Sequence, residues 1–218
     1  MRKAVVSAAF GPMHERMSGY SYHTFRRYAK NVGADFVPIT ERKFPERKPH
    51  LEKFQIRDIL QDYDVVLWVD CDALISRHAC SVFDHVPPGH FAAVDEGVHG
   101  TLIDVPRELR AVSDAAGLPF PEKRPFIYFN SGVFVAWKEH GRLFDNMPDR
   151  IPTEHGINDQ TLLNVRVALS GTPFTALAKT WNMIWVPPGF ELSHIVHFAG
   201  RLKNDGMIED MAQKALTI

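Results

Sequence analysis

Two carboxylates follow an uninterrupted apolar run in the middle of the chain. Val65–Val69 read VVLWV, and Asp70, Cys71 and Asp72 come directly after them. Consecutive apolar residues over this length indicate a strand covered on both faces. Residues i and i+2 of an extended chain point the same way, so Asp70 and Asp72 project together, about 6–7 Å apart at Cα. Their mutual repulsion favours a divalent cation as partner. We therefore expect a metal clamp, with a solvated turn as the alternative.

The elements that position this pair are predicted from the hydrophobic pattern. Strands are expected at Ala4–Phe10, Asp35–Ile39, Val65–Val69, Phe91–Val94 and Ile195–Phe198, with a pair of apolar pieces over Phe126–Val135. Helices are expected at Tyr20–Val32, His50–Gln61 and Asn158–Leu169, with a loop at Arg42–Pro49. This order predicts an α/β fold in which helices flank a mostly parallel central sheet. Ligands of such sheets bind beyond the carboxyl ends of the strands, where the aspartates lie.

Length and composition are those of an ordinary globular chain. The 218 residues suggest one domain over 1–218, and 45% are hydrophobic and 23% charged. The formal net charge of −1, without a cluster of Lys and Arg, argues against a nucleic-acid partner. No apolar run reaches the length of a transmembrane segment, and the N-terminal MRKAVVSAAF resembles a first strand more than a signal peptide. We therefore expect a cytoplasmic protein.

The two cysteines fit this compartment. Cys71 and Cys80 are the only ones in the chain, which suggests a reducing environment and no disulfide framework. Cys71 lies between the two aspartates. We interpret it as a small, partly buried side chain rather than a catalytic thiol.

An ordered set of motifs resembles the GT-A glycosyltransferases, especially glycosyltransferase family 8, which includes glycogenin and the bacterial lipooligosaccharide galactosyltransferases. The motifs are the apolar run with Asp70-Cys-Asp72, then Phe129-Asn-Ser-Gly-Val-Phe-Val135, and finally His197-Phe-Ala-Gly200-Arg-Leu-Lys203. Asp-x-Asp alone is a weak motif, whereas the ordered set is much more specific. The resemblance extends from the first strand to about Lys203. It implies a Rossmann-like GT-A domain that transfers a sugar from a nucleotide-diphosphate sugar, most plausibly a UDP-sugar, to a glycan, lipid-linked or protein-linked acceptor with retention.

The resemblance implies a metal and diphosphate site. Asp70 and Asp72, with His197 as third protein ligand, would hold Mn²⁺ (or Mg²⁺), and this donor set suits an octahedral Mn²⁺. Gly200 would let the backbone approach the phosphates, and Lys203 would add a positive charge. Taken alone, His197 would more often be a half-buried histidine at a strand end.

The resemblance also implies a sugar site. Asn130, Ser131 and Gly132 match the family segment that contacts the sugar. Asp95 follows a strand where the family places a sugar-contacting acid, and Glu96 is a neighbour that would share this role.

An Asp-Gln pair matches the family residues that open a helix near the anomeric carbon. Here these residues are Asp159 and Gln160. Satisfying the helix dipole is an equal alternative for Asp159. A double displacement would need a carboxylate nucleophile, for which Asp159 is the candidate. An inverting enzyme would need Asp95, Glu96 or Asp159 as general base.

Two regions upstream of the aspartates complete the expected site. Lys53 occupies the position where family 8 usually has an arginine near the diphosphate, and this lysine resembles family 34. A lysine would give a looser contact than an arginine fork. Ser7, Ala8 and Phe10 lie at the first strand-to-helix turn, which meets the nucleotide base in this fold.

Two other functions remain open from the sequence. Haloacid dehalogenase-like phosphatases also end an apolar strand in Asp-x-Asp, but that motif usually lies near the N-terminus and no later paired-aspartate loop follows here. A catalytically inactive GT-A protein that only binds sugar nucleotides is the other alternative. The intact set of Asp70, Asp72, His197 and Lys203 argues against it.

Overall fold

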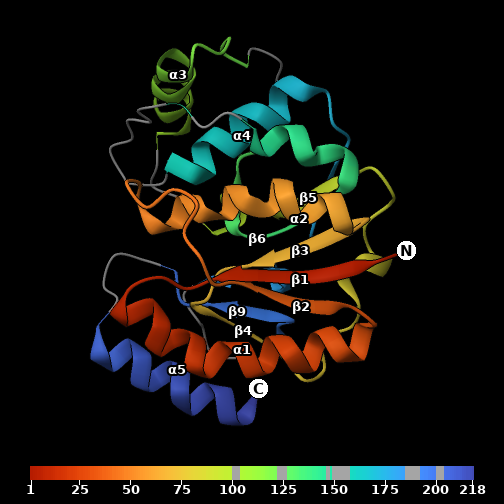
Figure 1. The fold of residues 1–218 in the computed structure, drawn as a ribbon, viewed down its shortest axis with the longest axis vertical. Coiled ribbons are helices and arrows are strands. Elements are labelled where there is room, and N and C mark those ends of the chain that lie inside the picture. The colour runs from red at the N-terminus through yellow and green to blue at the C-terminus, as the bar shows by residue number, and fades with distance from the viewer. Residues whose placement is uncertain (100–103, 122–126, 146–147, 149–157, 185–191, 200–203) are drawn as a thin grey trace.

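The computed structural model describes residues 1–99, 104–121, 127–145, 148, 158–184, 192–199 and 204–218. A central sheet lies between two groups of helices (Figure 1). Gly200 and Lys203, both expected in the site, lie outside the described residues. Among the described residues, no helix is both long enough and apolar enough to cross a membrane.

Six strands form the main sheet, in the order β2-β1-β3-β6-β5-β7. Their bounds are β1 Lys3–Ala8, β2 Asp35–Ile39, β3 Val65–Val69, β5 Phe91–Asp95, β6 Phe129–Trp137 and β7 Phe174–Ala176. β1 pairs in parallel with β2 and β3, and β5 pairs in parallel with β7. Only β6 runs antiparallel to its neighbours β3 and β5. The prediction of a mostly parallel sheet is confirmed.

A second, three-stranded sheet continues from the carboxyl end of β3. It contains β4 (Ala73–Ile75), β9 (Ile195–His197) and β8 (Met183–Ile184), in the order β4-β9-β8. β9 pairs antiparallel with β4 and parallel with β8. This small sheet lies near the face of the molecule that carries α1 (Figure 1).

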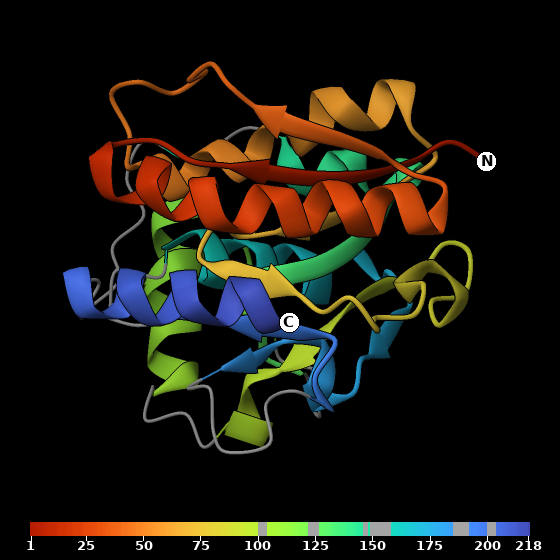
Figure 2. The same cartoon turned by 90° about the horizontal axis from the view of Figure 1, so that it is seen from below.

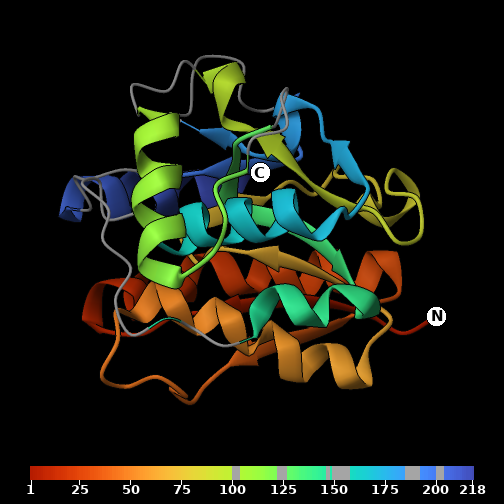
Figure 3. The same cartoon turned by 90° about the horizontal axis from the view of Figure 1, so that it is seen from above.

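The helices cover both faces of the main sheet. They are α1 Pro12–Val32, α2 Ile56–Asp62, α3 Val105–Ala116, α4 Asn158–Ser170 and α5 Asp205–Thr217. In the orientation of Figure 1, α1 and α5 lie side by side below the sheet, and α2, α3 and α4 lie above it. Figure 2 shows the molecule from the side of α1 and α5, and Figure 3 shows it from the opposite side. A cluster of buried residues joins α1, α5 and the second sheet, and includes Met17, Leu74, Val196, Ile208 and Met211.

Burial on both faces explains the apolar run before the aspartates. All five residues of β3 are buried. Val66 and Trp68 pack into the core beneath α2 and α4, whereas Val65, Leu67 and Val69 pack into the core on the α1 side. The first carboxylate therefore appears only after this buried strand has ended.

Several predicted boundaries need correction. The first helix begins at Pro12, not Tyr20, because proline is favoured in the first helical turn; it ends at Gly33 as predicted, with a left-handed φ of 65°. The predicted helix His50–Gln61 is a 3₁₀ segment, Pro49–Gln55, followed by α2. The two apolar pieces over Phe126–Val135 correspond to one strand, β6, with Asn130-Ser131-Gly132 inside it.

Three short strands and two helices were not predicted. β4, β7 and β8 contain three residues or fewer, too few for a recognisable alternation. The helices α3 and α5 each begin with a capping side chain, Asp104 and Asn204 respectively, which accepts a hydrogen bond from a backbone N–H. These caps are the sequence signal that would have located both helices.

Candidate active site

Three potential metal ligands meet where the two sheets adjoin. Asp70 and Asp72 follow β3, and the pairing of β4 with β9 places His197 opposite Ala73. One ligand atom from each of Asp70, Asp72 and His197 lies within 4.8 Å of the other two. His197 Nε2 lies 3.3 Å from Asp72 Oδ1. The structure therefore brings together the three residues expected to form the clamp.

The donor set fits a divalent cation. Asp72 and His197 are each only 3% exposed, so their polar atoms depend on one another rather than on water. Asp70 is more open, with 30% of its side chain exposed. Two carboxylates and one imidazole with an accessible side suit an octahedral ion such as Mn²⁺ that completes its shell with oxygen ligands.

Gly132 on β6 makes room for the imidazole of this cluster. A Cβ atom at Gly132 would lie 2.1 Å from His197 Cε1 and 2.8 Å from His197 Nδ1. Real Cβ contacts are essentially never this short, so any other residue would displace the ring. The backbone carbonyl of Gly132 also accepts a hydrogen bond of 2.8 Å from Asp70 N. Close approach thus explains the glycine in the Asn-Ser-Gly segment.

Lys53 is buried beside the clamp. Its Nζ lies 2.5 Å from Asp159 Oδ2 and 3.5 Å from Asp70 Oδ1. It also donates to Ser131 O at 3.1 Å and to Ser131 Oγ at 3.0 Å. An ammonium has three protons, and these partners use all of them. Lys53 therefore links the first aspartate of the clamp to the first turn of α4.

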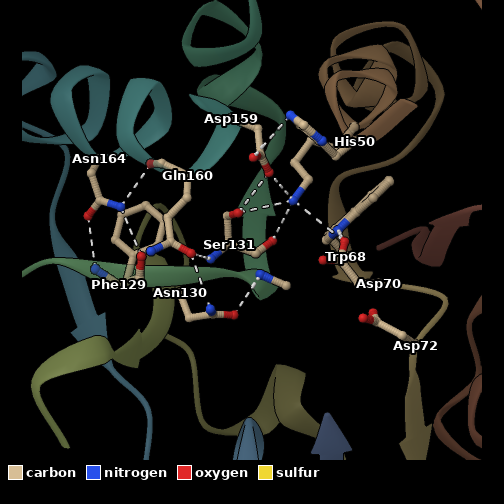
Figure 4. A network of polar contacts seen from close by, with 12 residues as sticks. His50, Trp68, Asp70, Asp72, Phe129, Asn130, Ser131, Asp159, Gln160 and Asn164 are labelled. Carbon is tan, nitrogen blue, oxygen red and sulfur yellow. Dashed lines mark hydrogen bonds and ion pairs between the residues drawn. The ribbon is translucent and has the colours of Figure 1, made fainter. Parts of the chain in front are cut away.

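Trp68 also holds the first aspartate of the clamp. Its Nε1 donates a 2.7 Å hydrogen bond to Asp70 Oδ1, the same oxygen that faces Lys53 (Figure 4). The Lys53 ammonium in turn lies 5.6 Å from the centroid of the Trp68 ring. Two donors thus fix the rotation of the Asp70 carboxylate and leave Oδ2 for a ligand.

Side-chain amides connect β6 to α4 and to the clamp. Gln160 Oε1 accepts hydrogen bonds from Asn130 Nδ2 at 3.1 Å and from Ser131 N at 3.2 Å (Figure 4). Asn182, which is fully buried, donates from Nδ2 to Asn130 Oδ1 at 2.9 Å. Its Oδ1 lies 2.9 Å from His197 Nδ1. The three potential metal ligands and the predicted sugar-binding residues therefore share one hydrogen-bonded network.

Comparison with known proteins identifies the family. A family model described as a Rhodobacterales glycosyltransferase domain matches residues 2–162. The chain belongs to this glycosyltransferase family. None of the curated protein sequences matches it significantly. Because the chain belongs to a glycosyltransferase family, the alternative of a haloacid dehalogenase-like phosphatase is not favoured.

Solved structures of glycosyltransferases share the fold. One, involved in glycosylation of the major capsid of PBCV-1, is 14% identical with a TM-score of 0.63, over 98% of this chain and 100% of that chain. An active-site mutant of LgtC is 10% identical with a TM-score of 0.62, over 97% and 95%. Galactosyltransferase LgtC in complex with donor and acceptor sugar analogues is 11% identical with a TM-score of 0.59, over 99% and 96%. The predicted GT-A fold is confirmed.

In this glycosyltransferase the buried side chains of Lys53 and Asp159 shift each other's pKa. Burial alone would raise the pKa of Asp159, but the charges of Lys53 and His50 and the hydrogen bonds from Lys53 and Ser131 outweigh it and lower the pKa to about 2. Burial alone would lower the pKa of Lys53, but Asp159 and Asp70 outweigh it and raise the pKa above its ordinary value. The ion pair therefore remains charged over the whole neutral range.

The lowered pKa predicts an acid-sensitive contribution to stability. A carboxylate whose pKa falls on folding stabilises the protein above its unfolded pKa, which is 3.8 for Asp159, and loses this effect as the pH falls to the folded value. We expect the difference in unfolding free energy between wild type and Asp159→Asn to be constant between about pH 5 and 8 and to shrink between about pH 4 and 2. Urea unfolding across this range measures it. A difference independent of pH would contradict the assignment.

Gly132→Ala is expected to disrupt the group of three potential metal ligands. The new Cβ atom would force His197 away from Asp72, so affinity for Mn²⁺ should fall at least about tenfold, as for other disturbed metal shells. Mn²⁺ titration followed by electron paramagnetic resonance measures this affinity. Gly19→Ala is the matched control, because a Cβ atom there meets nothing within 4 Å in the middle of α1. Equal Mn²⁺ affinity in both variants would refute the steric argument.

The two acids at the carboxyl end of β5 have different surroundings. Asp95 Oδ1 accepts a 3.0 Å hydrogen bond from Gly97 N, which closes a local turn. Burial raises the pKa of Glu96 above its ordinary value, although a hydrogen bond with Asn130 and the charge of His197 oppose the rise. Glu96 thus reaches the amide network, whereas Asp95 is committed in part to its own loop. Their roles toward a sugar stay predictions.

A pocket of about 150 Å³ opens beside the clamp. It is lined by Ala8, Phe10, His14, Pro49, His50, Trp68, Asp70, Cys71 and Asp72. Ala8 and Phe10, which the resemblance implies to be near the nucleotide base, therefore lie at a pocket beside the clamp. Ser7 is not among the lining residues: it is fully buried on β1, where alternation directs it toward the α1 side with Val5. Cys71 is buried, as expected for a small packing residue.

Three residues of the site have no role in the sequence-based prediction. Trp68 is hidden there as one more apolar residue of β3, and its N–H becomes relevant only beside Asp70. His50 lines the pocket, and its Nε2 lies 3.8 Å from Asp159 Oδ1. Asn182 follows the short 3₁₀ segment Lys179–Trp181 and is fully buried, so its contacts become apparent only in the folded chain.

Proposed function

We propose that this glycosyltransferase uses a metal ion to transfer a sugar from a nucleotide-diphosphate sugar, namely a UDP-sugar, to a hydroxyl of a glycan, lipid-linked or protein-linked acceptor. The observation that carries the proposal is the clustering of Asp70, Asp72 and His197 within 4.8 Å beside the pocket. A diphosphate brings negative charge to this site, and two carboxylates would repel it unless a cation lay between them.

Residues of the chain would hold each part of the donor. Asp70, Asp72 and His197 would hold Mn²⁺, which when bound acts as a Lewis acid and neutralises charge on the leaving diphosphate. Ala8 and Phe10 line the pocket in which the nucleoside would lie. The diphosphate would also contact Gly200 and Lys203, as the resemblance to family 8 implies.

Retention by front-face attack is the stereochemical course that we propose. Asp159, the candidate nucleophile for a double displacement, is 6% exposed and committed to Lys53 and to the hydroxyl of Ser131. A carboxylate held in a buried ion pair is a poor nucleophile. The acceptor hydroxyl would instead attack on the face that the diphosphate leaves, and the departing phosphate would take its proton. Asn130 and Gln160, with Asp95 or Glu96, would hold the sugar.

Properties of a structural neighbour support the proposed partners. LgtC, described as a galactosyltransferase, was solved in complex with donor and acceptor sugar analogues on the same fold. The motif order that this chain shares with family 8 supports a similar donor and a similar course. Lys53 in place of the usual arginine supports a link to family 34 instead.

Calorimetric titration with UDP-, GDP- and TDP-sugars, with and without Mn²⁺, tests the proposal. We expect one nucleotide class to bind only with Mn²⁺, and we expect Asp72→Ala to lose that binding. This outcome would identify the base. If no sugar nucleotide binds and Mn²⁺ changes nothing, the proposed donor site is wrong. Binding without transfer or hydrolysis would instead favour the inactive sugar-nucleotide-binding protein.

A further inference from the structure

The backbone of β6 fixes the polarity of the amide network. Ser131 N lies 3.2 Å from Gln160 Oε1, and Gly132 N lies 2.9 Å from Asn130 Oδ1. A backbone N–H can only donate, so both side-chain atoms that face these groups must be oxygens. The Asn130 nitrogen consequently faces Gln160 Oε1, at 3.1 Å. The orientation of both amides therefore follows from the chain itself.

The same logic extends to the next amide. Asn130 Oδ1 has a second neighbour at 2.9 Å, a terminal atom of the Asn182 amide. Because Asn130 presents an oxygen there, Asn182 must present its NH₂ group. Turning Asn182 over would bring two oxygens together in a fully buried place, which is disfavoured because neither acceptor would have a donor. Asn182 Oδ1 is then the atom 2.9 Å from His197 Nδ1.

The network therefore determines which nitrogen of His197 carries the proton when a cation occupies the cluster. An amide oxygen can only accept, so the proton of the neutral imidazole is on Nδ1 once a cation lies between Nε2 and the Asp72 carboxylate, which would otherwise compete for that proton. The lone pair is then on Nε2, the atom that lies 3.3 Å from Asp72 Oδ1. A histidine ligates a metal through an unprotonated nitrogen, and a hydrogen bond at its other nitrogen fixes the ring.

We propose that Asn182 is a positioning residue that holds His197 as the Nδ1-protonated tautomer, with Nε2 directed to a divalent cation between Asp70 and Asp72. This inference rests on the proposed metal site. The orientation originates at Ser131 N and Gly132 N and reaches His197 through Asn130 and Asn182. Because Asn130 also bonds Gln160, one network orients the imidazole and the predicted sugar-binding amide together.

The tautomer can be measured without any turnover. Long-range ¹H–¹⁵N correlation spectra of the labelled wild type saturated with Mg²⁺, a diamagnetic divalent cation, report which ring nitrogen is protonated. His197→Gln identifies the signals. We expect the Nδ1-protonated form to dominate for His197. A dominant Nε2-protonated form would overturn the inference.

Two substitutions of Asn182 test the positioning role through Mn²⁺ affinity. Asn182→Leu removes the acceptor for His197, and we expect a loss of about 10- to 100-fold. Asn182→Asp keeps an oxygen for the Nδ1 proton while losing the donor to Asn130, so affinity should stay within a few-fold of wild type. Electron paramagnetic resonance of free Mn²⁺ measures both. Wild-type affinity in Asn182→Leu, or an equal loss in both variants, would contradict the role.

A second buried asparagine supplies the control. Asn164 bonds the backbone of Phe129 and of Gln160 but does not contact His197. Asn164→Leu should lower stability and leave Mn²⁺ affinity per folded molecule unchanged. If Asn182→Leu does not fold, the tautomer of His197 in the wild type and the Mn²⁺ affinity of Asn182→Asp still test the positioning role. Absence of Mn²⁺ binding to the wild type would refute the proposed function, whereas normal Mn²⁺ binding to the wild type with the same affinity in Asn182→Leu would refute the positioning role alone.

Discussion

Asp72→Asn is expected to lower the rate of sugar transfer by about 10³-fold or more. The substitution keeps the size of the side chain but removes the charge that faces His197 Nε2 at 3.3 Å. A metal ion contributes several kcal/mol of transition-state stabilisation, and each 1.36 kcal/mol changes the rate about tenfold. Initial rates of donor turnover at saturating Mn²⁺ and nucleotide sugar measure the effect.

The control for Asp72→Asn is another loss of one carboxylate. Asp62 ends α2 and is exposed, so Asp62→Asn changes the net charge equally without touching the cluster. We expect its rate to stay within about twofold of wild type, as for ordinary surface substitutions. If Asp72→Asn retained a tenth or more of wild-type activity, a metal held by Asp72 would have no part in the rate-determining step.

Lys53→Met is expected to destabilise the protein by about 3–5 kcal/mol, because it leaves a charged carboxylate buried without its partner. Asp159 is 6% exposed, and the Lys53 ammonium lies 2.5 Å from it. Denaturant unfolding at pH 7 measures the change in free energy.

An exposed ion pair gives the comparison for Lys53→Met. Lys43 and Asp58 lie 2.5 Å apart, and about half of each side chain is exposed. Lys43→Met should cost at most about 1 kcal/mol. In the double variant Lys53→Met/Asp159→Leu, stability should recover in large part, since replacing both charges avoids the unpaired one. A cost for Lys53→Met no larger than for Lys43→Met would show that the buried pair is not charged.

The sequence predicts the clamp well because its signals are local. The apolar run of β3 indicates a strand buried on both faces, and the carboxylates beyond it can only lie at the end of that strand. The predicted strands at Asp35–Ile39 and Val65–Val69 match β2 and β3. His197 was placed by the resemblance rather than by its spacing, and the pairing of β4 with β9 brings it to the aspartates.

The remainder of the site depends on contacts between residues far apart in the chain. Lys53 was expected near the diphosphate, but its partners are Asp159, Ser131 and Asp70, from three other segments. No local pattern encodes a lysine that is 1% exposed. The role of Asn182 likewise follows from two backbone N–H groups of β6, whose direction only the folded chain determines.

Anomalous diffraction from crystals grown with Mn²⁺ and a nucleoside diphosphate tests the central claim most directly. We expect one strong manganese peak, at an ion bound by Asp70, Asp72 and His197 Nε2, with the diphosphate oxygens completing the shell of the ion. A fully bound nucleoside diphosphate with no manganese peak at these residues, or with the peak elsewhere, would contradict a metal-dependent glycosyltransferase built on this cluster.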